Sequence, residues 1–365
     1  MLQDLIAEVA ALAPQQLLAL GIFTSYFALI LWLFTRVLDS IQIASSQNER
    51  GRKSSLIDLF WILTAASFAH TWFYMFQYMA WSFSNFEAKN GIAASSGILM
   101  RVANWLCETS LFEEAWAAVC FGKMNWWWSE QLCLFTVGAW TIFLYVEGSH
   151  HQIKHVWAYM LLGQVVAISV ASNLFYIALL SAKSQPRREG SIAVPAKLWI
   201  PVFISLATIP ISPFTDEKTF LPNLLIMHVL IVLPLLSVSP LKVTKTGFSL
   251  SIFYLTVFLC SIPIRSRTVL NAASVLPEID QSPYALFRAA WTTLHSHPAQ
   301  SSIGWDVVWT TISFVIWIVV SSTTLNLFTT IYLLVASPFA SVGVTAPYVL
   351  RPRTHSTSDS ETKDD

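Results

Sequence analysis

Four charged residues fall within one otherwise apolar stretch, residues 98–121: Arg101, Glu108, Glu113 and Glu114. A charged side chain at the centre of a transmembrane helix costs about 2.5–3.5 kcal/mol on insertion scales, so charges that persist there commonly serve a function. Desolvation disfavours the ionised form of a buried carboxyl group, which is then able to donate a proton at neutral pH. The stretch therefore predicts acid–base chemistry inside a membrane, with Glu113 or Glu108 as the proton donor.

Helix geometry indicates which of these residues share a face. Arg101 and Glu108 are seven residues apart, about two turns, and Trp105 lies between them on the same face. Glu113 and Glu114 are adjacent, so their side chains point about 100° apart. We expect Arg101 to orient Glu108 or to bind a polar head group. The alternative is that Arg101 and Glu108 form a packing ion pair and that Glu113 and Glu114 are solvated near the opposite surface.

A second candidate is Glu147, which is followed closely by three histidines in the segment EGSHHQIKH, residues 147–155. Three histidines within six residues are able to bind a metal ion. Membrane di-iron enzymes need several such clusters, however, and this is the one cluster in the chain. We therefore predict a loop without a metal or other cofactor. Glu147, like Glu114, is expected to accept the terminating proton or to tune the acid.

Tryptophan is abundant, with 16 residues, and its positions support two interpretations. Tryptophans at the ends of predicted spans are typical of interfacial belts. Tryptophans nearer the predicted interiors have faces that stabilise cations. A membrane pocket with carboxylic acids and aromatic walls suits carbocation chemistry. The residues expected to line such a path are Trp105, Trp116 and Trp140.

Composition limits which kind of protein can hold these residues. Hydrophobic residues make up 55% of the 365 and charged residues 12%, about half the ~25% usual for a soluble domain. A soluble globule cannot hide that much apolar surface. Lys+Arg and Asp+Glu both number 21, so there is no basic excess to attract nucleic acid. The composition predicts an integral membrane protein whose main partner is the lipid bilayer.

Charge-free apolar runs predict an all-α helical bundle with eight to nine transmembrane helices. The ninth candidate is the charged stretch Ile98–Phe121. If this stretch crosses, most Lys and Arg residues fall on one side, which the positive-inside rule makes cytosolic. The N-terminus would then face the lumen or exterior. The charge-free runs are Leu17–Thr35, Leu59–Phe83, Gln131–Val146, Val156–Ser181, Leu198–Ser212, Phe220–Ser237, Phe248–Ile264 and Val307–Ala336.

The remaining organisation is simple. Residues 1–349 are predicted to form a single transmembrane domain and residues 350–365 a disordered polar tail. The mostly polar connection Arg265–Asp306 is expected to hold a surface helix around Tyr284–His295. Glu130, after the Trp126–Trp128 triplet, is expected at the membrane boundary. No internal repeat is detected, which counts against a secondary transporter.

Missing motifs narrow the chemistry further. The one Asp-Asp pair is Asp364–Asp365, and neither DDxxD nor NDxxDxxxD occurs. An enzyme that ionises a prenyl diphosphate would need such clustered carboxylates for Mg²⁺. Ionisation of a diphosphate is therefore disfavoured.

Residues 108–179, beginning ETSLFEEAWAAVCFGKMNWWWSEQ, resemble fungal membrane-bound terpene cyclases of the ascochlorin and ascofuranone type. The segment HTWFYMFQYMAW, His70–Trp81, shares the resemblance. The resemblance implies a multi-pass enzyme of the endoplasmic reticulum or another internal membrane. It implies a lipophilic prenylated substrate, a farnesyl chain that is often terminally epoxidised and carries an aromatic or polyketide-derived head. It also implies an upstream prenyltransferase and epoxidase.

The sequence therefore predicts a terpene cyclase of meroterpenoid biosynthesis, an isomerase whose reaction begins with protonation. The resemblance transfers no residue roles, so the site prediction rests on the charges in the membrane. The alternative is a proton-coupled transporter for a small metabolite, which would use the same glutamates for coupling.

Overall fold

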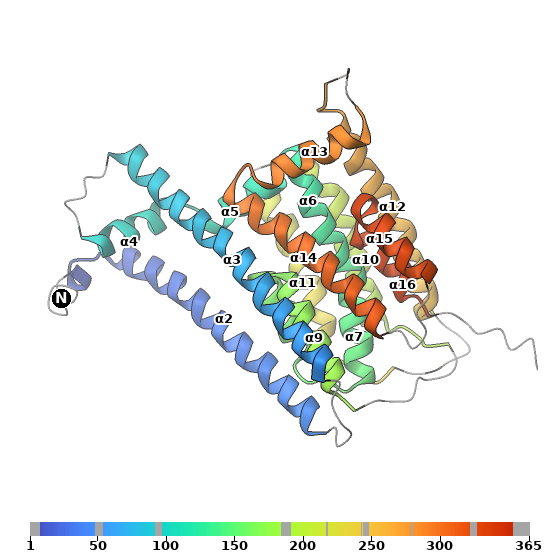
Figure 1. The fold of residues 1–365 in the computed structure, drawn as a ribbon. Helices are drawn as coiled ribbons and strands as arrows, with labels where there is room; N and C mark the ends of the chain where they lie inside the picture. Colours follow the sequence, from blue (N-terminus) through green and yellow to red (C-terminus); the bar gives the residue numbers. More distant parts are fainter. Residues whose placement is uncertain are drawn as a thin grey trace, which may run out of the picture.

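The computed structural model of the chain is a bundle of α-helices (Figure 1). Between the described residues the pairing of extended backbone is limited to two isolated bridges, Ile192–Val243 and Ala193–Ser249. The predicted tail, residues 350–365, lies outside the described part of the chain from residue 353 onward. The structure describes residues 8–47, 54–91, 97–183, 191–216, 218–241, 243, 248–277, 279, 281–321 and 327–352.

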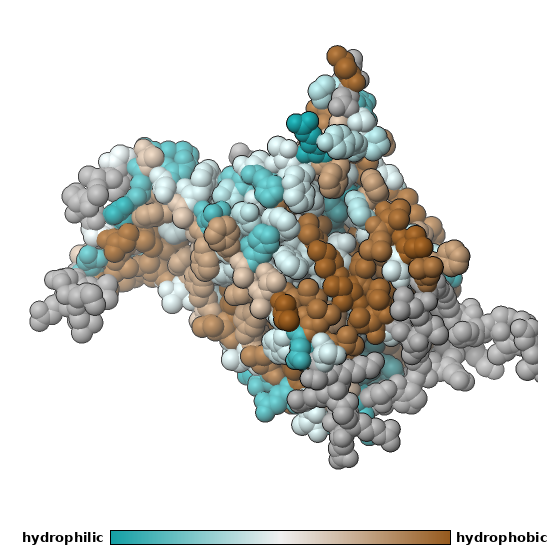
Figure 2. Space-filling model, in the orientation of Figure 1, coloured by the Kyte–Doolittle hydropathy of each residue, from teal (hydrophilic) through white to brown (hydrophobic). Residues whose placement is uncertain are grey.

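Six of the described helices are long and apolar enough to cross a membrane, which confirms an all-α polytopic membrane protein. Large exposed hydrophobic side chains cover much of the outer surface (Figure 2). A shorter helix, α11 (Phe220–Val232, continued by η3, Leu233–Leu235), runs antiparallel to α10 along its length. The six are α2 (Pro14–Ser46), α3 (Ser54–Asn90), α6–η1–α7 (Lys123–His150), α10 (Ala196–Ile211) with its continuation η2 (Ser212–Phe214), α12 (Leu250–Ala273) and α14 (Pro298–Ser321).

The charged stretch Ile98–Phe121 does not cross, contrary to the prediction. It forms two short helices, α4 (Ile98–Glu108) and α5 (Leu111–Cys120), because Thr109 and Ser110 leave helical geometry. The Tyr78 hydroxyl donates to the carbonyl of Leu111 at 2.8 Å, which holds the start of α5 near the end of α3. Both helices lie on the face where α3 ends and α6 begins (Figure 1).

The predicted span Val156–Ser181 is also not a single crossing. It is a hairpin of α8 (Val156–Val165) and α9 (Ile168–Ser181), broken where Ala167 is extended. The carbonyl of Lys154 accepts from Ser40 near the end of α2, and the carbonyl of Val165 accepts from Tyr26 further up. The hairpin thus enters the bundle from the side where α2 ends. Helix α9 returns to that side, where the backbone of Lys183 lies against His151.

A second hairpin closes the chain. Helix α15 (Leu327–Ala340) and helix α16 (Val342–Leu350) are joined at Ser341, whose φ of 76° turns the backbone sharply. The Ser337 and Thr345 hydroxyls share a hydrogen bond of 2.9 Å across it. Arg351, beyond α16, donates to Ser251 at the start of α12. The predicted span Val307–Ala336 is therefore a crossing helix followed by the rising arm of a second hairpin.

The two halves of the bundle repeat one order of elements, although no repeat is detectable in the sequence. Each half has a descending and an ascending helix, a surface segment, another descending helix and a hairpin that returns to its own side. In the first half these are α2, α3, α4–α5, α6–α7 and α8–α9; in the second they are α11, α12, α13 (Pro283–Leu294), α14 and α15–α16. Helix α13 confirms the predicted surface helix. The halves interlock, since α14 packs on α3 and α9, whereas α6 and η1 pack on α12 and α16.

The central helix of the bundle is α6–η1–α7. Of its most apolar 18-residue stretch, 78% is buried inside the protein. Its middle, η1 (Phe135–Trp140), is a π-helix, a form that is rare and frequent at functional sites. A Cβ on Gly138 would approach Val257 of α12 to 2.7 Å, and one on Gly343 would approach Leu134 to 2.5 Å. These glycines let α12 and α16 pack directly against the central helix.

We predict that this topology is visible to a membrane-impermeant thiol reagent. In a cysteine-free background, Lys89→Cys and Lys123→Cys should react from one side of the membrane, because α4 and α5 do not cross. Lys154→Cys and Lys183→Cys should react from the other side, because the first hairpin returns to where it enters. All four lysines are exposed. If Lys89→Cys and Lys123→Cys react from opposite sides, the stretch Ile98–Phe121 crosses the membrane, as predicted from the sequence.

Candidate active site

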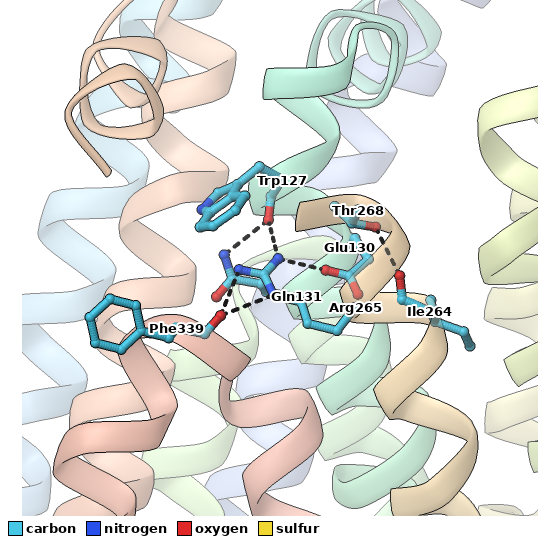
Figure 3. A network of polar contacts seen from close by, with 7 residues as sticks. All are labelled: Trp127, Glu130, Gln131, Ile264, Arg265, Thr268 and Phe339. Carbon is cyan, nitrogen blue, oxygen red and sulfur yellow. Dashed lines mark hydrogen bonds and ion pairs between the residues drawn. The ribbon is translucent and has the colours of Figure 1, made fainter. Parts of the chain in front are cut away.

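A buried ion pair joins the central helix to α12 (Figure 3). Arg265 Nη1 lies 2.8 Å from Glu130 Oε2, and the side chains are 3% and 0% exposed. The same nitrogen donates to the carbonyl of Trp127 at 3.2 Å, and the guanidinium lies 4.1 Å from the centre of the Trp127 ring. The core therefore holds a cation between a carboxylate and an indole face, both of which stabilise positive charge.

Arg265 also contacts the tip of the second hairpin. Its Nε and Nη2 donate to the carbonyl of Phe339 at 3.4 and 3.5 Å. Phe339 belongs to the last turn of α15, where carbonyl groups lack partners inside the helix and the helix dipole is negative. A cation at this position stabilises the C-terminal end of the helix.

Asp306 of α14 plays the complementary role at the first hairpin, where a negative charge meets the N-terminus of a helix. Its Oδ2 and Oδ1 accept the backbone N–H groups of Ile168 at 2.9 Å and Ser169 at 2.8 Å. These are the first residues of α9, where N–H groups are unpaired and the dipole is positive. The side chain is buried, and both oxygens are occupied, so Asp306 acts as an anionic helix cap.

Glu130 and Asp306 occupy matching places in the two halves. They are the eighth residue of α6 and the ninth of α14, so each lies about 10–12 Å along its helix axis. Arg265 lies about 12 Å from the end of α12 on the same side. We call Glu130, Arg265 and Asp306 the buried charged layer. Asp306 contacts the tip of the first hairpin, and Arg265 contacts the tip of the second.

Aromatic rings fill the core beyond this layer. Trp140, at the end of the π-helix, packs against Phe143, Phe175 and Tyr176 with ring centroids 5.5 to 6.2 Å apart. Tyr176 stacks on Trp317 of α14 at 4.6 Å and 5°. A narrow gap among these rings holds about 140 Å³ of space between atoms, no part of it wide enough for water. Its lining is Phe135, Ala139, Trp140, Phe143, Tyr176, Phe314 and Leu350.

Several polar groups beside this aromatic core have no hydrogen-bond partner. One face of α9 carries Ser172, Asn173 and Tyr176, and their side-chain polar atoms are buried and unpaired. The Trp140 indole N–H and Glu130 Oε1 are unpaired as well. Buried polar atoms in native proteins are nearly always paired, with water or a ligand if not with protein. The group therefore marks a place where a bound molecule would find polar partners beside aromatic walls.

The glutamates predicted to act as acids lie elsewhere. Glu108 is the exposed last residue of α4. Glu114 is exposed, and its Oε1 accepts the backbone N–H of Ser110 at 3.2 Å. Glu113 is half-buried beside it in the first turn of α5, where acidic side chains complement the helix dipole. The structure brings none of the three to the buried charged layer.

The other predicted residues are also dispersed. Arg101 pairs with Glu87 of α3, not with Glu108. Trp105 is buried among other residues of the α2–α5 region and donates to Ser82 at 3.1 Å, whereas Trp116 stacks on His228. Trp140 is the one predicted tryptophan within the aromatic core. Glu147, at the far end of the central helix, lies 3.9 Å from His150 and 3.6 Å from His151.

Glu130, Arg265 and Asp306 were placed at membrane boundaries or in a connection by sequence reasoning. Each borders a charge-free run, since Glu130 and Asp306 directly precede one and Arg265 directly follows one, which is typical of a membrane boundary. The signal that could have found them is that apolar residues continue on both sides, as in WWWSEQLCLF, SIPIRSRTVL and GWDVVW. Their pairing carries no sequence signal, because Glu130 and Arg265 are 135 residues apart.

Comparison with known proteins adds one partial match. A family model for a protein of unknown function, DUF2834, matches residues 253–355. This segment runs from α12 through α16, so it coincides with most of the second half of the bundle. No curated protein and no solved structure matches the chain.

We predict that Glu130 and Arg265 depend on each other for stability. Glu130→Leu or Arg265→Met alone should lower the free energy of unfolding by about 3–5 kcal/mol, because each leaves a buried charge unpaired. The double variant should be more stable than the sum of the single effects implies. The free energies of unfolding of the two single variants and the double variant are measured in detergent micelles. If the two single losses of stability add up in the double variant, the two charges are independent.

Asp306→Asn should cost about 1–2 kcal/mol of stability, because the amide keeps one acceptor oxygen but loses the charge at the α9 N-terminus. The matched control is Glu108→Gln, an acid-to-amide change at an exposed helix end, which should stay within about 0.5 kcal/mol of wild type. Equal effects of the two changes in the same unfolding assay would argue against the capping role.

Proposed function

We propose that the protein is a membrane terpene cyclase that cyclises a farnesyl chain, carried on a polar head, by protonation. The observation that carries the proposal is the aromatic core of the central helix, which begins at Phe135, about 7 Å along the helix axis from a buried carboxyl group with one unpaired oxygen. A carbocation survives only where water is excluded and π-faces or anions surround it. The resemblance of residues 108–179 to fungal meroterpenoid cyclases supports the same function.

Glu130 is the acid that we propose for this reaction. Its ionised form pairs with Arg265 through Oε2, and its buried Oε1 has no protein partner. The acid form that we propose for the reaction carries its proton on Oε1 while Oε2 still accepts from Arg265. The O–H bond of this carboxyl breaks as its proton passes to a substrate alkene or epoxide oxygen. The cation formed closes the ring by attack of internal alkenes. Loss of a proton from the product cation to the carboxylate restores the acid, so product and substrate have equal mass.

The aromatic core has the second role. At about 1.5 Å per residue, Phe135 lies about 7 Å, Trp140 about 15 Å and Phe143 about 20 Å further along the helix axis than Glu130. Tyr176 packs on Trp140 and Phe143 from α9. The gap between them is closed in the absence of substrate, so binding must move side chains apart. The π-helix at Phe135–Trp140 supplies a segment of the central helix whose hydrogen bonds are not the regular α type.

We place the cyclase in the endoplasmic reticulum or another internal membrane of the cell. Its lipophilic substrate enters laterally from the bilayer. A prenyltransferase must attach the farnesyl chain beforehand, and an epoxidase must act where the substrate is an epoxide.

One observation favours a second candidate, a proton-coupled transporter of a small metabolite. Two related halves with broken helices that meet near the middle of the membrane are typical of transporter folds. Here, however, both hairpin tips are closed by protein charges, Asp306 and Arg265, and the gap in the core admits no water. These features count against an open path for a polar solute.

The test is conversion of an epoxyfarnesyl-substituted phenol by yeast membranes that contain the protein. We expect a cyclised product of unchanged mass, and Glu130→Gln should lower the rate at least 100-fold, because general acid catalysis contributes 10²–10⁴-fold. The same substrate without the epoxide, converted in D₂O, should gain one carbon-bound deuterium if an alkene is protonated.

Comparison variants make this outcome specific. Trp140→Phe should keep most of the activity and Trp140→Leu should lose it, because the π-face and not the indole N–H is needed. If Glu113→Gln loses activity and Glu130→Gln does not, the proton donor is Glu113, as predicted from the sequence, and not Glu130. Proton-dependent solute uptake into vesicles, without cyclised product from any prenylated substrate, would replace the cyclase with the transporter.

A further inference from the structure

Three metal-ligating side chains converge at the end of the central helix, away from the buried charges. Glu147, His150 and His151 follow the spacing i, i+3, i+4, so one turn of α7 and its C-cap present them together. A carboxylate oxygen of Glu147 and one ring nitrogen of each histidine all lie within 4.8 Å of one another. The side chains are 31%, 20% and 19% exposed, so solvent reaches the group.

The distances within the group suit a shared ion better than direct hydrogen bonds. Glu147 Oε2 lies 3.9 Å from His150 Nδ1 and 3.6 Å from His151 Nε2, beyond normal hydrogen-bond length. Ligands that bind one zinc ion at about 2.1 Å are about 3.4 Å apart. Small side-chain rotations would bring these three atoms to that separation.

The backbone around the group is fixed in a way that holds the imidazoles in place. The N–H of His151 donates to the carbonyl of Glu147, and the N–H of Ile153 donates to the carbonyl of Gly148, both at 2.9 Å. Gln152 and His155 have positive φ of 53° and 52°, which turns the chain tightly after the helix. The backbone of Lys183, from the returning arm of the first hairpin, lies against the His151 ring.

We propose that Glu147, His150 and His151 bind a divalent first-row transition metal ion. Two histidines and one carboxylate form the ligand set of catalytic zinc sites and of non-haem iron(II) sites. Three protein ligands leave at least one coordination position open for water or another oxygen ligand. The site goes beyond the cyclase proposal and does not depend on it.

The experiment uses the full-length protein in detergent, purified through a tag without histidine and treated with a chelator. We expect it to bind one Zn²⁺ per chain by elemental analysis after desalting. Co²⁺ should bind in its place and give visible absorption bands typical of nitrogen and oxygen ligands. Glu147→Gln and His151→Ala should each weaken Zn²⁺ binding tenfold or more.

The matched control is His155→Ala, which removes the third histidine of the same segment. His155 lies outside the group, near Trp157, so its loss should leave Zn²⁺ binding unchanged. A symmetrical size-exclusion peak for each variant shows that the bundle is folded. The proposal is overturned if wild type binds less than stoichiometric Zn²⁺, or if His155→Ala and His151→Ala weaken binding equally.

Discussion

Two helix ends inside the bundle impose the constraint on which the rest of the structure depends. The tips of the α8–α9 and α15–α16 hairpins lie part-way along the membrane-spanning helices, and a helix end leaves backbone groups unpaired. The N-terminus of α9 needs acceptors and favours negative charge, and Asp306 supplies both. The C-terminus of α15 needs donors and favours positive charge, and Arg265 supplies both. At each hairpin tip, a side chain whose charge is opposite to that of the helix dipole there stabilises the helix end.

This constraint accounts for the interlocking of the two halves. Asp306 lies in the second half and caps the hairpin of the first, so the halves cannot separate without exposing a helix end. Arg265 in turn would be an unpaired buried cation without an anion, and Glu130 of the first half neutralises it. Its face contact with Trp127 adds further stabilisation. The charges that the bundle needs for its architecture are therefore the same charges that give its dry interior an acidic group.

The central helix connects architecture to chemistry. Along one helix the chain passes from Glu130, through the π-helix and its aromatic neighbours, to Glu147 and the histidines at the opposite face. Glycines at 138 and 343 allow close packing on this helix, which keeps the aromatic gap too narrow for water. Exclusion of water would protect the cationic intermediate of the proposed reaction, and it strengthens the electrostatic contacts of the buried charges. At the far end of this helix, Glu147, His150 and His151 are partly exposed to solvent, whereas the aromatic core is buried.

The sequence by itself determined that the protein is an all-α membrane bundle, where most of its long helices run, and that a surface helix precedes α14. Apolar length and composition carry this information, because a bilayer accepts few other structures. Hydropathy could not separate one crossing from a hairpin that returns, since Val156–Ser181 has the apolar length of either. It also favoured the charged stretch at residues 98–121 as the site, although its glutamates mostly serve helix ends. Only the tertiary structure decided where the buried charges meet, because Glu130 and Arg265, like Asp306 and α9, are distant in the chain and close only through packing.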